Sequence, residues 1–294
     1  MLRFFRDGKL KVVWEYHVSG IIWRLLFSGN DRIVGEDRDQ HSKRVSFFCL
    51  DARSGRPLWE DLRMDEQWWI TIELIGEGVL FLNEFVRPDL PEQGKIYAVD
   101  LETGSLLWKN SELKILFVAG AQVYAVNELF DRRIYYALDV RSGERVSEFE
   151  DGAEQINLLR EEQRSTVEEG MLFPEILTEQ SRHFNLVQSI VTSRCGVDGM
   201  KGPVEFIHFG KYVLIGFHRF LPTASRAIDT QPDTREGMLE NRFLIVEADS
   251  HKIVLEETLN KKVPNPAPNS FFVQCDLAYY IRDKQHLVAV QLKT

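Results

Sequence analysis

FFCLDARSGRPLW occupies residues 47–59, and the same pattern returns as IYAVDLETGSLLW over residues 96–108. A third copy, YYALDVRSGERVS, covers residues 135–147, and a degenerate fourth copy, FLIVEADSHKIVL, covers residues 243–255. The first three copies follow one another at roughly 40–50 residues, a period typical of repeat proteins that build one small sheet per copy. The fourth copy comes about two such periods later, so we expect additional chain before it.

Each copy is predicted to form a strand, a tight turn and a second strand. The apolar run before the acidic residue fits a buried strand. In the turn, the acidic and hydroxyl side chains can hydrogen-bond the backbone, and glycine supplies a positive φ. A tryptophan four residues after the glycine, present in the first two copies, can fill the wedge between neighbouring sheets. The repeat positions are Asp51, Gly55, Trp59, Asp100, Gly104, Trp108, Asp139 and Gly143.

Four strands can be assigned to each repeat, which predicts an all-β chain built as a β-propeller. We expect five blades in a single domain over residues 1–294. The last blade is one strand short, and residues 10–16 complete it by pairing with residues 286–292, which removes the exposed edges. A six-bladed ring, with residues 152–200 as a degenerate blade, is the alternative.

The repeats resemble those of a known family. LDARSGRPLW and VDLETGSLLW look like the repeats of PQQ-like (quinoprotein-type) β-propellers, which share a WD40-like architecture. The quinoprotein dehydrogenases of that family are much larger and carry adjacent cysteines near the quinone. Cys49, Cys195 and Cys275 are far apart here. The resemblance therefore implies the architecture without the cofactor, and we expect the protein to bind none.

Residues 150–203 differ from the repeats. Between residues 150 and 182, nine acidic residues stand against three arginines. Phe184, Val187 and Val191 recur at helical spacing, with Ser181 as a predicted N-cap. We interpret this segment as an acidic, partly helical insertion between the third and fourth blades. It serves either as a packing appendage or as a docking surface.

Composition narrows the class of protein. The net charge is −9 with a pI near 5.4, and the sequence has no long run of lysine and arginine, which argues against nucleic acid and anionic membranes as partners. No stretch approaches the length of about 18 apolar residues that a membrane span needs. The cysteines and histidines lack the spacing of zinc ligands. We expect a cytoplasmic protein without a metal site.

Long connections are expected on one face of the propeller. The turns between the first and second strands of each blade, and between the third and fourth, are short. The long segments are residues 37–43, RPDLPEQG (87–94), the insertion 150–203 and the loop 221–241. Because long loops on a rigid scaffold concentrate binding residues, this face is the predicted binding face. Its candidate residues are Arg87, Asp89, Arg219, Arg226, Asp229 and Arg235.

Evidence for catalysis is weaker. Some propellers with carboxylates around a central funnel hydrolyse glycosides, with paired acids at a defined separation. The acidic residues on the innermost strands are Glu73, Glu205 and Asp276. Their positions spread over roughly 16 Å along the axis, at about 3.3 Å per residue. Such a spread does not favour a catalytic pair.

The sequence therefore favours a non-catalytic scaffold that binds an unidentified protein or peptide, with a monomer expected. The alternative is a hydrolase of a glycan or small molecule in the central funnel. Trp68 and Trp69 at the entry of a central strand favour packing, with stacking on a ligand as the second interpretation.

Overall fold

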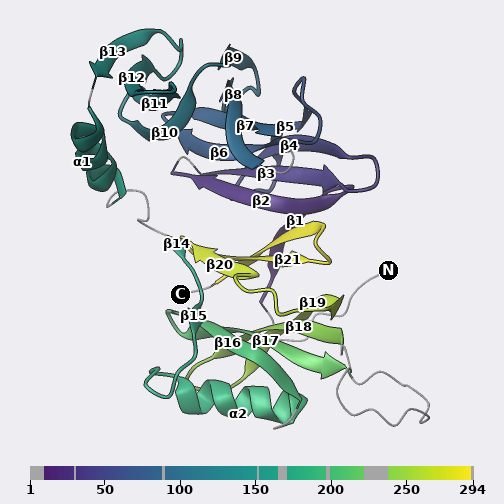
Figure 1. Cartoon of the computed structure of the whole chain (residues 1–294). Helices are drawn as coiled ribbons and strands as arrows, with labels where there is room; N and C mark the ends of the chain where they lie inside the picture. Colours follow the sequence, from purple (N-terminus) through teal and green to yellow (C-terminus); the bar gives the residue numbers. More distant parts are fainter. Residues whose placement is uncertain are drawn as a thin grey trace, which may run out of the picture. The chain divides into compact units, whose positions relative to one another are not determined.

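The computed structural model describes residues 10–29, 31–87, 90–150, 152–164, 171–196, 199–221 and 238–292. The chain divides into two compact units, and each is described by itself. One unit is residues 18–169, and the other joins residues 1–17 to residues 170–294. Within these described ranges they contain five separate antiparallel sheets of four or five strands, so the predicted all-β class is confirmed (Figure 1).

The unit of residues 18–169 contains three four-stranded sheets whose strands lie in sequence order. The first sheet is β2 (Ile21–Ser28), β3 (Arg32–Asp39), β4 (Arg44–Asp51) and β5 (Pro57–Leu62). The second is β6 (Ile70–Gly76), β7 (Val79–Arg87), β8 (Leu90–Asp100) and β9 (Leu106–Asn110). The third is β10 (Lys114–Ala119), β11 (Gln122–Glu128), β12 (Arg133–Asp139) and β13 (Arg145–Glu150), followed by helix α1 (Ala153–Arg164).

The other unit contains two five-stranded sheets. One runs β15 (Glu175–Ile176), β16 (Met200–Phe209), β17 (Tyr212–Leu221), β18 (Met238–Glu247) and β19 (Ile253–Val263). The other runs β1 (Val12–His17), β22 (His286–Gln291), β21 (Leu277–Arg282), β20 (Phe271–Gln274) and β14 (Met171–Leu172). Helix α2 (Phe184–Cys195) lies along the face of the first of these sheets (Figure 1).

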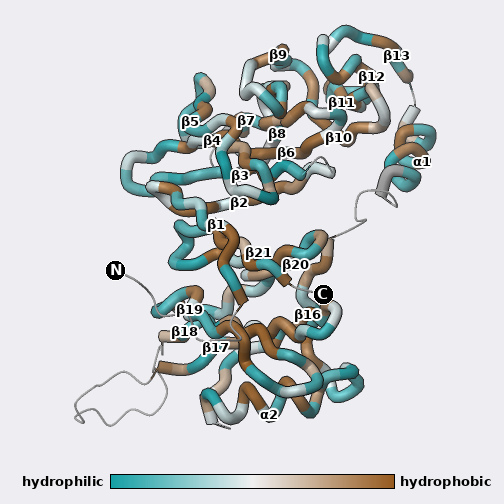
Figure 2. Tube along the Cα trace, turned by 180° about the vertical axis from the view of Figure 1, so that it is seen from behind, coloured by the Kyte–Doolittle hydropathy of each residue, from teal (hydrophilic) through white to brown (hydrophobic). Residues whose placement is uncertain are grey.

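The core follows from the apolar runs in the central strands. In β17, seven consecutive residues from Tyr212 to His218 are buried, because both faces of the strand are covered. Buried side chains from the sheets β2–β5 and β6–β9 form one cluster, and those from β6–β9 and β10–β13 form the next. Within the unit of residues 18–169, neighbouring sheets therefore pack through shared hydrophobic clusters, as expected of sheets that cannot bury their faces alone. Figure 2 shows hydrophobic stretches along the strands of this unit.

Strand β1 lies at one edge of a sheet whose other strands are β20, β21 and β22 near the end of the chain and the short β14. Val12 pairs with Val290 and Tyr16 with Leu287, within the segments predicted to pair, and the pairing extends one residue further to His17 and His286. The indole of Trp14 is buried and meets Tyr279 edge-on at 5.8 Å. The pairing gives β22 two neighbours instead of one. Closure of the whole chain into a single ring, and its organisation as one domain, stay predictions.

Among the described residues, the segment 150–203 contains the helices α1 and α2, and the periodicity of Phe184, Val187 and Val191 indicated α2. The segment also contains β14 and β15, which each join a sheet, so its role as an insertion stays a prediction. Ile156 of α1 packs against the sheet β10–β13, and Val187 and Val191 of α2 are buried against β16 and β17. The predicted N-cap is wrong. The hydroxyl of Ser181 accepts the backbone N–H of Thr178 at 3.0 Å, which stabilises a turn before the helix.

Two of the predicted long connections are shorter than expected. Strand β3 runs to Asp39 and β4 begins at Arg44, so only residues 40–43 connect them. In the next sheet Phe85 pairs with Gln93 and Arg87 with Leu90, so most of residues 87–94 belongs to a hairpin. The pairing of β7 with β8 is irregular here, with register shifts between Asn83 and Phe85 and between Phe85 and Arg87. The loop 221–241 lies largely outside the described residues.

Candidate functional site

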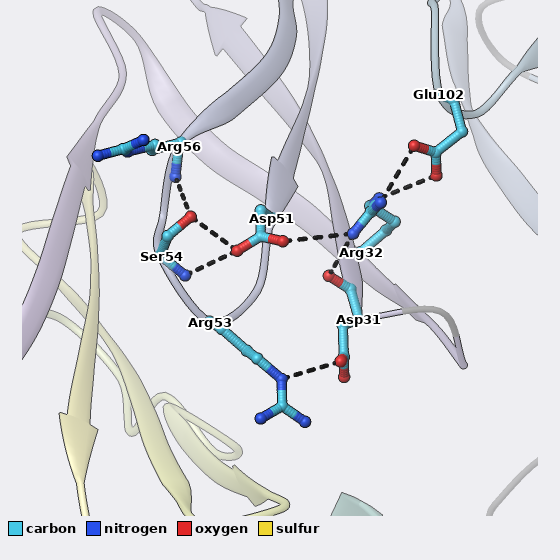
Figure 3. Close-up of polar contacts among 7 residues, drawn as sticks. All are labelled: Asp31, Arg32, Asp51, Arg53, Ser54, Arg56 and Glu102. Carbon is cyan, nitrogen blue, oxygen red and sulfur yellow. Dashed lines mark hydrogen bonds and ion pairs between the residues drawn. The ribbon is translucent and has the colours of Figure 1, made fainter.

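The first repeat turn forms the hydrogen bonds that its sequence predicts (Figure 3). Asp51 Oδ1 accepts the backbone N–H of Ser54 at 2.8 Å and its hydroxyl at 2.7 Å. The other carboxylate oxygen faces Arg32 at 3.3 Å. Arg32 also holds Glu102, in the turn of the next sheet, with Nε and Nη2 at 2.9 and 3.1 Å. Hydrogen bonding to Ser54 and the charge of Arg32 lower the pKa of Asp51.

The two repeat tryptophans each join their own sheet to the next one in the unit of residues 18–169. Trp59 Nε1 donates to the carbonyl of Leu101 at 2.8 Å, and Trp108 Nε1 donates to that of Val140 at 3.1 Å. A Cβ on Gly104 would lie 2.9 Å from the Trp59 ring, and one on Gly143 would lie 2.7 Å from the Trp108 ring. The turn glycine is therefore required both for its positive φ and for the close approach of the ring.

The degenerate fourth copy keeps the same turn. His251, in the position of the glycine, has a φ of 55°. Its N–H donates to the carbonyl of Glu247 at 2.9 Å, and the hydroxyl of Ser250 donates to the Glu247 carboxylate at 2.8 Å. The described repeat positions thus form the same turn in all four copies.

The three acidic residues considered for catalysis lie in different surroundings. Glu73 belongs to the unit of residues 18–169, whereas Glu205 and Asp276 belong to the other unit. Burial raises the pKa of Glu73 and of Glu205. The Glu205 carboxylate accepts the backbone N–H of Asn269 at 3.1 Å, and the Asp276 carboxylate accepts the amide of Gln291. These two acids have structural partners, and a catalytic role for them stays a prediction.

The aromatic pair Trp68 and Trp69 is part of a stack of rings and cations. The Arg38 guanidinium lies over the Trp68 ring, 5.1 Å from its centroid, and the Lys43 ammonium lies over the same ring at 4.8 Å. Glu66 accepts both tryptophan backbone N–H groups at 2.8 Å. Trp68 is partly buried, whereas Trp69 is 38% exposed, so packing of the pair and stacking on a ligand both stay predictions.

Of the residues predicted on the binding face, Arg219 is the one whose side chain the structure describes. Asp89, Arg226, Asp229 and Arg235 lie outside the described residues, as does the side chain of Arg87. Arg219 lines a pocket of about 240 Å³ in the sheet β15–β19 beside the end of α2. The pocket is lined by Ser193, Arg194, Phe217, Arg219, Arg242 and Glu256.

We call these lining residues, together with Glu240, the arginine pocket. Its five charged side chains alternate in sign. Arg219 Nη2 contacts Glu240 Oε2 at 2.6 Å, and Arg242 Nη1 contacts the same oxygen at 3.4 Å. Arg242 Nη2 also binds Glu256, whose other oxygen lies 3.1 Å from Arg194 Nη2. The order is therefore Arg219, Glu240, Arg242, Glu256, Arg194, with an arginine at each end.

The elements explain why these side chains meet. Arg219 lies directly opposite Glu240 across β17 and β18. Glu240 and Arg242 are two residues apart, and side chains at that spacing lie on the same face of a strand. Arg194 lies in the last turn of α2, where a cation complements the helix dipole. Burial raises the pKa of the neighbouring Cys195 thiol, and the charge of Arg219 offsets part of that rise.

Sequence reasoning missed Arg194, Arg242, Glu240 and Glu256. The charge pattern Glu-x-Arg at the start of β18 was a usable signal, because such alternation places both charges on one face of a strand. The register that brings Arg219 opposite Glu240 was hidden by the long connection between β17 and β18.

A second pocket in the same unit, of about 380 Å³, contains two histidines. The rings of His183 and His208 lie 4.4 Å apart between centroids. Burial lowers the pKa of His183, and the neighbouring His208 lowers it further. Within the described ranges, no cluster of three or more histidine, cysteine, aspartate or glutamate side chains could hold a metal ion. No helix in the same ranges is long and apolar enough to cross a membrane.

Comparison with known proteins gives one family match. A model described as Domain of unknown function (DUF4905) matches residues 28–108, which contain the first two repeat copies. No curated protein matches the chain.

Several solved structures are similar at low identity. A europium-containing methanol dehydrogenase is 12% identical with a TM-score of 0.31, over 94% of this chain and 52% of that one. The β-propeller domain of the Trilobed protease from Pyrococcus furiosus is 13% identical with a TM-score of 0.30, over 89% of this chain and 64% of that one. A eukaryotic initiation factor is 10% identical with a TM-score of 0.33, over 90% and 52%. The chain thus spans about half the length of the first of these, 52%.

Proposed function

We propose that this chain is a five-bladed β-propeller of the PQQ-like repeat type, with a helical insertion, that acts as a non-catalytic scaffold for a protein or peptide. Five separate sheets, two of them joined to their neighbours by a tryptophan on a turn glycine, support the architecture. The pairing of β1 with β22 supports closure of the ring. The scaffold works in the cytoplasm, as a monomer and without a cofactor, a metal or nucleic acid.

The arginine pocket is the observation that carries the binding role. It opens in the sheet β15–β19 and includes Arg219 of the predicted binding face. Arginine is enriched where partners meet protein surfaces, because its planar guanidinium makes several directed hydrogen bonds. The side chains of Arg219 and Arg194 are 36% and 41% exposed, so both can be reached from solvent.

The alternative function is hydrolysis of a glycan or small molecule, and Glu73 is the residue that favours it. Its carboxyl group is partly buried with a raised pKa, the property that a general acid needs. It accepts one long hydrogen bond, from the Gln93 amide at 3.4 Å. A second acid within roughly 5–10 Å would be required for glycoside hydrolysis.

The test compares capture of partners by three proteins. Wild-type chain, Arg219→Glu and Arg53→Glu are used as bait in a lysate of the native cells. Arg53 is the matched control, since its side chain is 70% exposed and lies in a repeat turn of the other unit. We expect a partner that binds the wild type and Arg53→Glu at equal levels and is lost with Arg219→Glu. Equal capture by all three would contradict the proposed binding face.

The hydrolase alternative has its own measurement. A panel of chromogenic glycosides and esters is incubated with the wild type and with Glu73→Gln. The scaffold proposal expects no turnover above the buffer rate. Turnover by the wild type that is lost in Glu73→Gln would replace the scaffold with the hydrolase.

A further inference from the structure

We infer that the arginine pocket binds a carboxylate, supplied by an acidic side chain of the partner, between Arg194 and Arg219. The inference deepens the proposed function, because it names the chemistry that the scaffold recognises. It is carried by the order of charges in the pocket and by the hydrogen bonds already formed there.

Among the described residues, the charge order leaves one anion missing. In that part of the chain, three guanidinium groups alternate with two carboxylates, so these five side chains have an excess of one positive charge. Arg242 in the middle binds a carboxylate with each of its two terminal nitrogens. Arg219 and Arg194 at the ends each contact a single carboxylate in the network. A third carboxylate between them would complete an alternating ring of three cations and three anions.

Both end arginines line the same pocket, so one ligand can contact both. The pocket of about 240 Å³ is large enough for a carboxylate group and its methylene stem. Phe217, which also lines it, offers an apolar surface for that stem. A guanidinium binds a carboxylate through paired, charge-assisted hydrogen bonds, which are stronger than neutral ones.

The same donors accept phosphate, and the charge balance decides between the two. One negative charge neutralises the pocket, whereas a phosphate dianion would reverse its charge. Glu256 also lines the wall and would lie near the added anion. The pocket adjoins the C-terminus of α2, where the helix dipole contributes further negative charge. These features favour a monoanion over a dianion.

The competing explanation is that the network only fastens α2 to the sheet. Arg194 on the helix contacts Glu256 on β19, so the network does join the two. A fastening role requires Arg194, Glu256 and Arg242. It does not require Arg219 at the far end, which contacts Glu240 on the neighbouring strand of the same sheet. The two explanations therefore differ in what loss of Arg219 does to anion binding.

The first arm of the test titrates small probes into the purified chain. The signals followed are the arginine Nε–Hε correlations in ¹H–¹⁵N NMR spectra, assigned with single variants. The probes are acetate, the uncharged isostere acetamide, chloride and inorganic phosphate, at constant ionic strength. We expect saturable shifts of the Arg219 and Arg194 signals with acetate. Acetamide and chloride should give none, and phosphate should bind more weakly than acetate.

Variants assign the effect to the pocket. Arg219→Gln and Arg194→Gln should each weaken acetate binding about tenfold, as expected for the loss of one charge-assisted contact. Arg53→Gln, in the other unit, should leave it unchanged. Unaltered backbone spectra away from the pocket show that each variant is folded. An acetate response equal to that of acetamide or chloride, or unchanged in Arg219→Gln, overturns the inference, as does tighter binding of phosphate.

The second arm distinguishes failure of the inference from failure of the scaffold proposal. It repeats partner capture with the wild type in the presence of acetate or acetamide. If acetate lowers capture of the partner and acetamide does not, the result supports both the scaffold proposal and the carboxylate inference. If capture depends on Arg219 but the probes do not bind, the scaffold proposal is supported and the carboxylate inference is overturned. If acetate binds saturably but capture does not depend on Arg219, the pocket binds a carboxylate and the scaffold proposal is overturned.

Discussion

At the residue scale, the contact between a tryptophan and a turn glycine explains the spacing within the repeat. The Trp59 ring, from the end of one sheet, lies on Gly104 in the turn of the next, and Trp108 lies on Gly143 in the same way. Each indole also donates to a backbone carbonyl of that turn. The spacing of four residues between turn glycine and tryptophan in one copy is thus set by the turn of the following copy.

Replacement of Trp59 by alanine should cost about 3 kcal/mol of unfolding free energy, the low end of the range for a large aromatic, because the ring is only partly buried. Trp59→Phe keeps a ring but loses the indole N–H, and should cost about 1 kcal/mol. Denaturant unfolding of both variants measures the difference. A cost below about 1 kcal/mol for Trp59→Ala would show that the ring contributes little to the core.

Gly104→Ala should be more harmful than Gly120→Ala. Both glycines have a positive φ, 71° and 52°, so both variants pay backbone strain of about 1 kcal/mol. A Cβ on Gly120 has nothing within 4 Å, whereas one on Gly104 meets the Trp59 ring. The excess cost should disappear in a Trp59→Ala background, which a double-mutant cycle measures. Equal costs of the two glycine variants in the wild type would argue against the contact.

At the element scale, side chains secure a connection that lacks regular backbone pairing. Residues 264–270, between β19 and β20, contain three prolines, which have no backbone N–H. The N–H of Ala267 donates to His218 Nε2 at 3.0 Å, and that of Asn269 donates to Glu205 at 3.1 Å. His218 is only 4% exposed, so its hydrogen bond forms away from water.

This connection makes stability depend on pH. Burial lowers the pKa of His218 below its value in the unfolded chain, which is about 6.5. The unfolded chain therefore binds the proton more readily, and stability decreases as the pH falls from about 6.5 through the native pKa. Protonation also removes the acceptor for Ala267. We expect the melting temperature of the wild type to fall between pH 7 and pH 5.

His218→Gln is the matched variant, since its amide oxygen can replace Nε2 as acceptor and does not titrate. The melting temperature of this variant should fall less over the same range. The raised pKa of Glu205 acts in the opposite direction, because a carboxyl group with a raised native pKa gains stability as the pH falls. The difference between variant and wild type therefore isolates His218. Parallel pH curves would show that the imidazole stays uncoupled from unfolding.

At the scale of the whole molecule, β1 near the start of the chain pairs with β22 near its end and forms one edge of their sheet. Besides the backbone pairing of β1 with β22, Arg282 binds Glu15, and Trp14 packs on Tyr279. Without β1, the long edge of β22 would be open to pairing with other chains. The role of β1 is thus both stability and protection from aggregation.

Deletion of residues 1–16 should lower the melting temperature by at least about 5 °C, as expected for the loss of a few kcal/mol in a chain of this size. It should also cause aggregation, measured by light scattering. Deletion of residues 1–9 is the control, because it keeps Leu10, whose N–H donates to the carbonyl of Val254, and all of β1. An unchanged melting temperature after the longer deletion would contradict the role of β1.

Local sequence was sufficient for the elements and the turns. The buried strands, the left-handed glycines at 55, 104 and 143, and the replacement of glycine by His251 could be predicted, because each depends on residues adjacent in the chain. The helix α2 was predictable from its periodicity, although its N-cap was not, because Ser181 bonds Thr178 in a preceding turn instead.

The candidate site could not be predicted, apart from Arg219. Arg194 comes from a helix, and Arg242 and Glu256 come from strands that follow a connection of many residues. Their meeting depends on the register across β17, β18 and β19 and on the packing of α2, which no short stretch of sequence encodes. Sequence alone determined the repeating strands and turns, since they arise from local hydrogen bonds and alternation. Only the tertiary structure decided which charges share a pocket, because charges distant in the chain interact once packing has brought them together.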